Sequence, residues 1–311
     1  MREGKQTANV TFTLAQHVKI AQFLDDFGVD IIEVGHPIVS PHETKCIKAV
    51  TRLNLRSQTL AHARARKEDI DAALQCGTNW VGIFAGINTL SLKHRYRHEK
   101  TKQQVLDMIA ESVAYAKGRG LLVKCSIEDA TRTPIEDIIE VAALAKRSGA
   151  DVLSITDTVG ITTPERFQDL LKTIRENVRI DLEVHCHNDY GLALANSLAA
   201  YRAGVKVIDV SVNGIGERAG ITSLAELCTS LKLLYEVKNT WQLDRLQEMS
   251  REVATISGVG MDNLRPIVGM NAFTHTADLH VKTVEREPKA YESIKPDSLG
   301  RKRRSISKRE Y

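Results

Sequence analysis

Short apolar runs alternate along this chain with longer stretches in which apolar residues recur at helical spacing. The runs are rich in β-branched residues and apolar almost throughout, which is typical of parallel strands that are covered on both faces. The longer stretches have the pattern of helices that bury one face. Seven strands are predicted, over residues 29–35, 57–63, 80–85, 121–126, 152–158, 182–187 and 207–212.

Several predicted helices begin with a capping signal. Residues 133–136 (Thr-Pro-Ile-Glu) and 223–226 (Ser-Leu-Ala-Glu) have the sequence of a capping box, and Thr163 stands before a proline. After residue 238 the alternation stops. Residues 239–257 have helical spacing, whereas residues 259–283 are predicted to consist mainly of loops.

Seven strand–helix units fit either a doubly wound open sheet or a (β/α)8 barrel. Seven is one short of a barrel, and the deficit lies at the front, where no strand precedes the first helix. We predict an α/β fold. It is a TIM barrel with its first strand largely missing, over residues 1–238, and a small, mainly helical extension over residues 239–311. The basic tail, residues 295–311, is expected to be solvated.

The composition is that of an ordinary globular protein. The 311 residues carry a formal net charge of +4, which is too weakly basic to indicate a nucleic-acid partner. Neither a signal peptide nor an apolar run of transmembrane length is present. The five cysteines are scattered and lack metal-site spacing, which favours a reducing compartment, so we expect a cytoplasmic protein without membrane contact.

His185 and His187 stand at the end of the sixth predicted strand. In an extended strand, residues two apart point to the same face, so both imidazoles would face one space, as two ligands of a divalent metal must. From the pair alone, a solvated strand with alternating polar residues is an equally good explanation.

Polar residues also follow the other predicted strands. Besides the two histidines they include Glu33, His36, His62, Arg64, Arg66, Glu128, Asp129, Arg132, Asp157, Thr158 and residues 213–218. In a barrel these strand ends meet at one rim, where active sites lie. Taken singly, each has a structural explanation. Together they predict a polar cavity for a metal and a small substrate with several carboxylates, and Glu3 would complete the metal site if Arg2-Glu3 ended a strand of its own.

Five segments resemble motifs of the homocitrate synthase and isopropylmalate synthase family, in the family's order and over nearly the whole chain. Residues 2–7 resemble its opening motif, and residues 185–191 its metal motif. The others are residues 126–132, 214–220 and 271–280. The resemblance implies a TIM-barrel acyltransferase of amino-acid biosynthesis that condenses acetyl-CoA with a 2-oxo acid and then hydrolyses the thioester.

The same resemblance implies roles for single residues. A divalent metal (Mg, Mn or Zn) would be held by Glu3, His185 and His187, and Arg2 would stabilise the developing alkoxide. The remaining assignments are Glu128 and His280 for acid–base catalysis, and His62, Arg64, Arg66, Arg132 and Thr158 for binding the substrate. The extension would act as a lid in a homodimer, with the segment around His280 reaching the partner's site.

Departures from the family pattern leave several functions open. Lys5 replaces a glutamate, and we expect a changed local charge there. Ile221 resembles homocitrate synthases, and Arg66 could bind a distal anion, so 2-oxoglutarate is the favoured substrate. Isopropylmalate, another alkylmalate or phosphonomethylmalate are alternative products. A retro-Claisen acyl-CoA lyase is disfavoured because residues 214–220 contain no cysteine.

The ends of the chain motivate a further alternative. No strand is predicted before the first helix, and the family resemblance runs up to residue 311, where isopropylmalate synthases continue into a regulatory domain. We therefore expect both termini to be abbreviated. A truncated, non-catalytic paralogue stays open as an alternative, because an incomplete barrel exposes unpaired strand edges.

Overall fold

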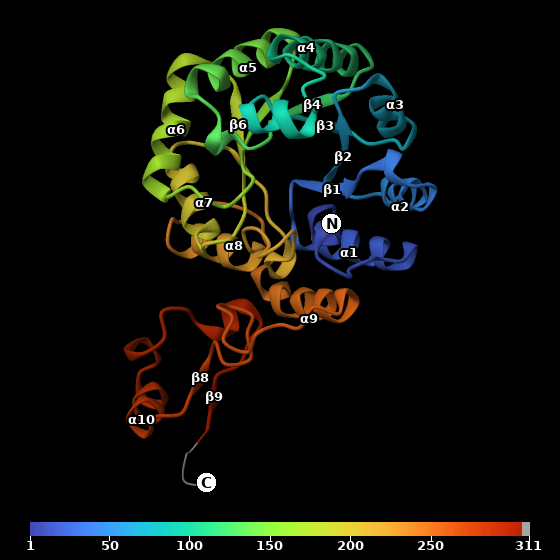
Figure 1. Cartoon of the computed structure of the whole chain (residues 1–311). Helices are drawn as coiled ribbons and strands as arrows, with labels where there is room; N and C mark the ends of the chain where they lie inside the picture. The colour runs from blue at the N-terminus through green and yellow to red at the C-terminus, as the bar shows by residue number, and fades with distance from the viewer. Residues whose placement is uncertain (307–311) are drawn as a thin grey trace.

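Seven parallel strands form one sheet in the order of the chain. In the computed structural model, which describes residues 1–306, the strands are β1 (Ile31–Gly35), β2 (Gln58–Arg64), β3 (Trp80–Ala85), β4 (Leu122–Ile127), β5 (Val152–Asp157), β6 (Asp181–Cys186) and β7 (Val207–Ile208). The sheet curls into an incomplete barrel with helices around its outside (Figure 1). The predicted fold class, a TIM barrel that lacks one strand, is confirmed.

The helices that cover the barrel alternate with its strands. They are α1 (Leu14–Phe27), α2 (Pro41–Thr51), α3 (Lys67–Gln75), α4 (Lys102–Gly118), α5 (Ile135–Ser148), α6 (Pro164–Asn177), α7 (Ala193–Arg202) and α8 (Leu224–Leu233). No helix among residues 1–306 is both long and apolar enough to span a membrane.

Two of the three predicted helix caps are wrong. Thr163 does cap α6, accepting a hydrogen bond from the Arg166 amide. Thr133 instead donates its hydroxyl to the Asp129 carbonyl at 2.9 Å, and α5 begins after Pro134 without a side-chain cap. Ser223 makes no side-chain cap, and Glu226, its expected capping partner, instead pairs with Arg265 at 3.3 Å.

The last strand is much shorter than predicted. Residues 207–212 were expected to be extended, but β7 covers only two residues. Beyond it the chain folds back, so that Thr222 occupies the place beside β6. The Thr222 amide donates to the Cys186 carbonyl, and the Ser211 amide donates to the Thr222 carbonyl. This return segment takes the hydrogen bonds that a longer β7 would need.

The barrel is open between β1 and β7, and a lateral cavity of about 610 Å³ lies there. At the rim the N-terminal segment crosses this gap. The Arg2 amide donates to the Glu33 carbonyl at 3.0 Å, and the Thr7 hydroxyl donates to the Gly216 carbonyl at 3.1 Å. A 3-10 turn, Glu3–Gln6, is thereby fixed over the ends of the strands.

The C-terminal extension is more ordered than predicted. After a 3-10 turn (Leu243–Arg245), α9 (Leu246–Ser257) packs against α1, and Met249 and Val253 share a core with Phe27. Within the expected loop, β8 (Thr274–His275) and α10 (Asp278–Arg286) form, and Figure 1 shows them set apart from the barrel.

Up to residue 306 most residues of the predicted tail are exposed, and the tail also contains regular structure. A 3-10 turn (Pro296–Leu299) precedes β9 (Arg304–Ser305), which pairs with β8. Arg303 donates two hydrogen bonds to Glu292, at 2.6 and 2.7 Å. Arg301 donates to the Ile267 carbonyl at 2.6 Å, so two of the basic residues serve local contacts. Residues 307–311 of the predicted tail lie outside the described residues.

Candidate active site and metal centre

Polar side chains from the strand ends meet in one cavity of about 590 Å³. Of the site residues predicted from the sequence, seven line it: Arg2, Glu3, His62, Glu128, Thr158, His185 and His187. They come from the N-terminal turn, β2, β6 and the segments that follow β4 and β5. The fold thus gathers the greater part of the predicted set at the carboxyl end of the barrel, as expected for this architecture.

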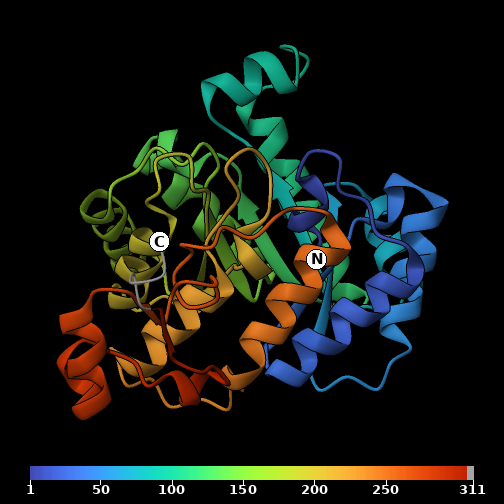
Figure 2. The same ribbon diagram turned by 90° about the horizontal axis from the view of Figure 1, so that it is seen from below.

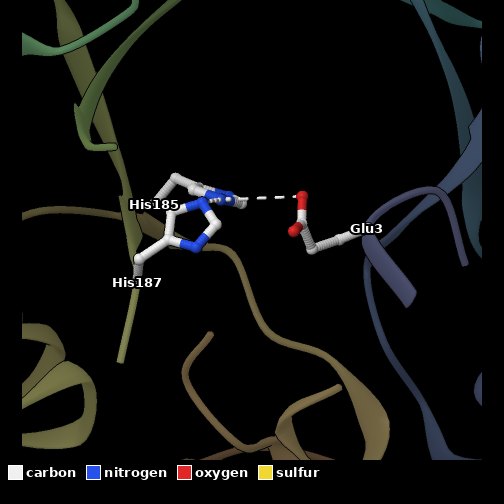
Figure 3. A group of neighbouring side chains, drawn as sticks. All are labelled: Glu3, His185 and His187. Carbon is white, nitrogen blue, oxygen red and sulfur yellow. Dashed lines mark hydrogen bonds and ion pairs between the residues drawn. The ribbon is translucent and has the colours of Figure 1, made fainter. Parts of the chain in front are cut away.

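Glu3, His185 and His187 form a compact group of metal-ligating side chains (Figure 3). The Nε2 atoms of the two imidazoles face each other at 3.2 Å, and Glu3 Oε2 lies 3.8 Å from His185 Nε2. All three side chains are buried, and their ligand atoms lie within 4.8 Å of one another. Glu3 arrives from the N-terminal 3-10 turn, not from the end of a strand as the sequence suggested.

The surroundings of this group fit a divalent cation. Burial, followed by the neighbouring His185, lowers the pKa of His187 to about 4, so at neutral pH it is an uncharged imidazole able to donate a lone pair. Its Nδ1 atom is buried without a hydrogen-bond partner among residues 1–306. Two imidazoles and one carboxylate are a common ligand set for a metal with open positions.

Asp209 orients the first histidine. The Nδ1–H of His185 donates to Asp209 Oδ2 at 2.9 Å, which turns Nε2 toward Glu3 and His187. A carboxylate behind a ligating imidazole fixes its tautomer and raises its basicity. Asp209 was not predicted. It lies one residue beyond β7, inside the predicted strand of residues 207–212.

Glu3 is held in place by three groups. The Glu217 amide donates to Oε1 at 2.9 Å, and Arg2 Nη1 donates to Oε2 at 2.9 Å. Burial raises the pKa of Glu3, but the Arg2 guanidinium and His185 outweigh burial, so the net pKa is lowered and the carboxylate stays ionised. Gly216 is the third group, because it packs directly against the carboxylate: a Cβ at this position would lie only 2.8 Å from Glu3 Oε1.

Replacing Gly216 with alanine is expected to displace the Glu3 carboxylate and weaken metal binding by about 10- to 100-fold, the range seen when the support of a ligand is lost. Isothermal titration with Mn²⁺ measures the effect, and circular dichroism checks the fold. Gly118→Ala is the matched control, since nothing lies within 4 Å of a Cβ at that position. Equal affinities in the two variants would contradict the assignment of Glu3 as a ligand.

A buried lysine beneath the metal group was missed entirely. Lys124, in the middle of β4, is 2% exposed, and its Nζ lies 2.5 Å from Glu33, 2.8 Å from Glu183 and 3.5 Å from Asp209. The three carboxylates resemble a second metal site, but the ammonium group already lies among them. A signal existed, because Lys124 precedes Glu128 by four residues, an even spacing that puts both side chains on one face of an extended chain.

This charged layer supports the residues above it. Glu33 also accepts hydrogen bonds from Arg2 Nε at 2.8 Å and from His62 Nε2 at 2.9 Å. Burial disfavours a charge on Lys124, but Asp209, Glu183 and Glu33 together raise its pKa, so it stays protonated. Burial and the nearby Asp209 raise the pKa of Glu183 to about 8, so it carries a proton at neutral pH.

Four predicted site residues do not line the cavity. Arg64 donates to Asp69 at 2.8 and 2.9 Å, and Arg132 donates to Asp129 at 2.8 Å. Arg66 is exposed at the start of α3, and His280 is exposed on α10 with its ring stacked on that of Tyr291 at 4.0 Å. Their roles stay predictions.

Other cavity residues were not assigned a role from the sequence. Lys5, which replaces a glutamate of the family motif, forms an ion pair with Glu43. The ion pair neutralises the change in local charge that was expected from this lysine. Arg218 pairs with Asp189 at 2.8 Å and donates to the Thr158 carbonyl at 2.7 Å, so it joins two loops of the rim.

Comparison with known families covers almost the whole chain. The HMGL-like family matches residues 1–253, and the family described as homocitrate synthase post-HMGL domain-like matches residues 267–310. The two matches follow each other along the chain without overlap.

Individual relatives carry different names. A homocitrate synthase from Pyrococcus horikoshii is 44% identical over 303 residues, which are 97% of this chain and 83% of that protein. A 2-isopropylmalate synthase from Methanocaldococcus jannaschii is 39% identical over 306 residues, 98% of this chain and 59% of that protein. The HMG-CoA lyase of Bacillus subtilis shares the fold alone, with a TM-score of 0.74 and 20% identity over 83% of this chain and 91% of the other.

Proposed function

This chain belongs to the HMGL-like family, among its acetyl-CoA-dependent enzymes that condense 2-oxo acids, and from that membership we propose that it converts 2-oxoglutarate and acetyl-CoA into homocitrate. The observation that carries the proposal is the group of Glu3, His185 and His187 in the wall of a cavity that also contains Arg2 and Glu128. A divalent cation on these ligands would polarise the carbonyl of the 2-oxo acid.

Different side chains of the cavity carry out the other steps of the reaction, which are charge stabilisation and proton transfer. Arg2, fixed by Glu3 and Glu33, donates hydrogen bonds to the oxygen that gains charge when the carbonyl carbon is attacked. Glu128 accepts a proton from the methyl group of acetyl-CoA, the resulting carbon nucleophile attacks the keto carbon, and water then cleaves the thioester and releases CoA. His280 acts as the second acid–base group.

The substrate carboxylates bind to hydroxyl and guanidinium groups. Thr158 Oγ1 accepts a hydrogen bond from the Asp129 amide at 2.8 Å and lies 3.0 Å from Thr156 Oγ1, whose hydroxyl donates to the Ile127 carbonyl. The Thr158 hydroxyl hydrogen therefore has to turn from Thr156 to a substrate carboxylate when the substrate binds. Arg132 and His62 assist there, and Arg64 and Arg66 bind the far end of the substrate. The preference for 2-oxoglutarate is supported by Ile221, which is buried in a β-bridge with His187 and resembles the residue of homocitrate synthases.

CoA-thiol release with a panel of 2-oxo acids tests the proposal. The panel contains 2-oxoglutarate, 2-oxoisovalerate, pyruvate and phosphonopyruvate, each with Mg²⁺, Mn²⁺ or Zn²⁺. We expect the highest kcat/KM for 2-oxoglutarate, and we expect Arg66→Ala to reduce its advantage over 2-oxoisovalerate. A higher value for another acid would replace homocitrate by the corresponding alkylmalate. If no acid of the panel gives CoA-thiol release, a non-catalytic paralogue is favoured. Cleavage of 3-hydroxy-3-methylglutaryl-CoA would favour a lyase.

We further propose a homodimer in which His280 enters the partner's cavity, because α10 stands apart from the barrel of its own chain (Figure 1). Glu3→Gln and His280→Ala enzymes should each be inactive alone. After mixing and subunit exchange, about a quarter of the wild-type activity should return, because half of the dimers are mixed and one of their two sites is intact. Gel filtration monitors the dimer. A mixture as inactive as its components would contradict a shared site.

A further inference from the structure

One segment of the rim is strongly basic. Residues 93–100, called here the basic rim segment, have the sequence Lys-His-Arg-Tyr-Arg-His-Glu-Lys, with four formal cations, two histidines and one carboxylate. The whole chain has a formal net charge of only +4. So high a local density of positive charge attracts anions to this part of the surface.

The basic rim segment begins at the cavity. It follows β3, and Figure 2 shows this turquoise part of the chain projecting beyond the ends of the strands. Arg95 forms an ion pair with Glu128, and its guanidinium lies 5.3 Å from the ring centre of Phe84. Because Glu128 and Phe84 both line the cavity, the segment connects the cavity mouth with the outer rim.

The segment has a fixed conformation. The side chains of Leu92 and Tyr96 pack against the main core, and the His98 amide donates to the Leu92 carbonyl at 3.1 Å. Arg97 and His98 have φ values of 50° and 61°, a left-handed conformation that residues other than glycine adopt rarely and only where the surroundings enforce it. The positive charges therefore lie on a loop whose conformation is fixed by its packing.

Most of these cations are available to a ligand. Within residues 1–306, Lys93, Arg97 and Lys100 have no carboxylate within ion-pair distance, and Lys93 and Arg97 are exposed. The nearby Lys102 differs, because its Nζ lies 2.5 Å from Asp137 and 2.6 Å from Glu140. Positive charge is thus neutralised by carboxylates just outside the segment, at Lys102, but not at Lys93, Arg97 and Lys100 inside it.

We propose that the basic rim segment binds the 3′-phosphate and pyrophosphate of the CoA moiety of the acyl-CoA substrate. The inference rests on the proposed function in that it takes acetyl-CoA as the co-substrate. The phosphates lie on Lys93, Arg97 and Lys100, and the pantetheine arm passes Phe84 and Arg95 into the cavity, which brings the thioester to Glu128. Lysine and arginine are the side chains that bind phosphate best. Because these three have no carboxylate partner, no ion pair has to be broken before a phosphate binds.

The test measures binding of the nucleotide part of CoA separately from the reaction at its thioester end. In the rim variant, Lys93, Arg97 and Lys100 are each replaced by glutamine. In the control variant, Arg147, Arg166 and Lys172 are replaced by glutamine. These are exposed cations of α5 and α6 for which the structure gives no ion pair within residues 1–306. Both variants lose the same charge, and thermal unfolding checks that both fold.

Binding of adenosine 3′,5′-bisphosphate and of CoA is measured by isothermal titration, which needs no turnover. We expect the rim variant to bind both about 30-fold more weakly, as three exposed charge pairs of roughly threefold each would give. The control variant should stay within about twofold, because only non-specific charge is lost. Unchanged binding in the rim variant, or an equal loss in both variants, would overturn the proposal.

Turnover distinguishes this inference from the proposed function. With acetyl-CoA the rim variant should show a raised KM and an unchanged kcat, whereas with acetyl-pantetheine, which lacks the nucleotide, it should match the wild type. If the wild type condenses acetyl-CoA and the rim variant has the same KM, the rim proposal fails while the function stands. If the wild type binds CoA through the rim but condenses none of the 2-oxo acids, the function fails while the rim site stands.

Discussion

A His187→Ala enzyme is expected to lose its metal and its condensing activity together. His187 Nε2 lies 3.2 Å from His185 Nε2 in a buried pair, so the alanine variant keeps only one imidazole and one carboxylate for the metal. Removing a group that only supports a ligand costs up to about 100-fold in metal affinity, and removing a ligand itself should cost more than that.

The experiment compares metal content after dialysis with CoA-thiol release. His42→Ala is the matched control, because His42 lies on α2 outside the cavity. Circular dichroism and thermal unfolding show whether the barrel persists. A His187→Ala protein that keeps stoichiometric metal at the wild-type affinity would remove His187 from the ligand set, and with it the main support for the proposed chemistry.

Lys124→Met is expected to lower the free energy of unfolding by about 3–5 kcal/mol, the usual consequence of removing one partner from a buried ion pair. Methionine fills a similar volume, but Glu33, Glu183 and Asp209 would then be left in the barrel interior without the ammonium group. Urea unfolding followed by circular dichroism measures the loss.

Lys102→Met provides the comparison. Lys102 also contacts two carboxylates, Asp137 and Glu140, but at the surface, where such pairs contribute at most about 1 kcal/mol. The pH dependence has a definite sign: without the lysine, the folded-state pKa values of the buried carboxyl groups rise, so the deficit should grow from pH 5 to pH 8. Equal losses in the Lys124 and Lys102 variants would show that the buried layer is not electrostatically coupled.

Much of the fold followed from local patterns. Apolar runs predicted six of the strands closely, because the residues of parallel strands covered on both faces must be apolar whatever surrounds them. The prediction was wrong where one segment competes with another for the same hydrogen bonds. The strand at residues 207–212 lost most of its length to the returning Thr222, and Thr133 bonded to Asp129 instead of capping α5. Neither competitor is adjacent in sequence.

The candidate site divides in the same way. The sequence by itself determined the pairing of His185 with His187, because the period of two in a strand sends both side chains to one face wherever that strand lies. It also determined that the strand ends carry polar groups. These are local consequences of backbone geometry.

Only the tertiary structure decided which distant groups join them. Glu3 approaches His185 because the N-terminal turn is bound to Glu33 and Gly216 at the rim, and Lys124 meets Glu33, Glu183 and Asp209 because four strands of the curled sheet turn one face to a common interior. The curvature of the sheet sets those distances. This curvature depends on how all the strands and helices pack together, not on any single segment. The barrel thus converts separate strand ends into one charged cavity.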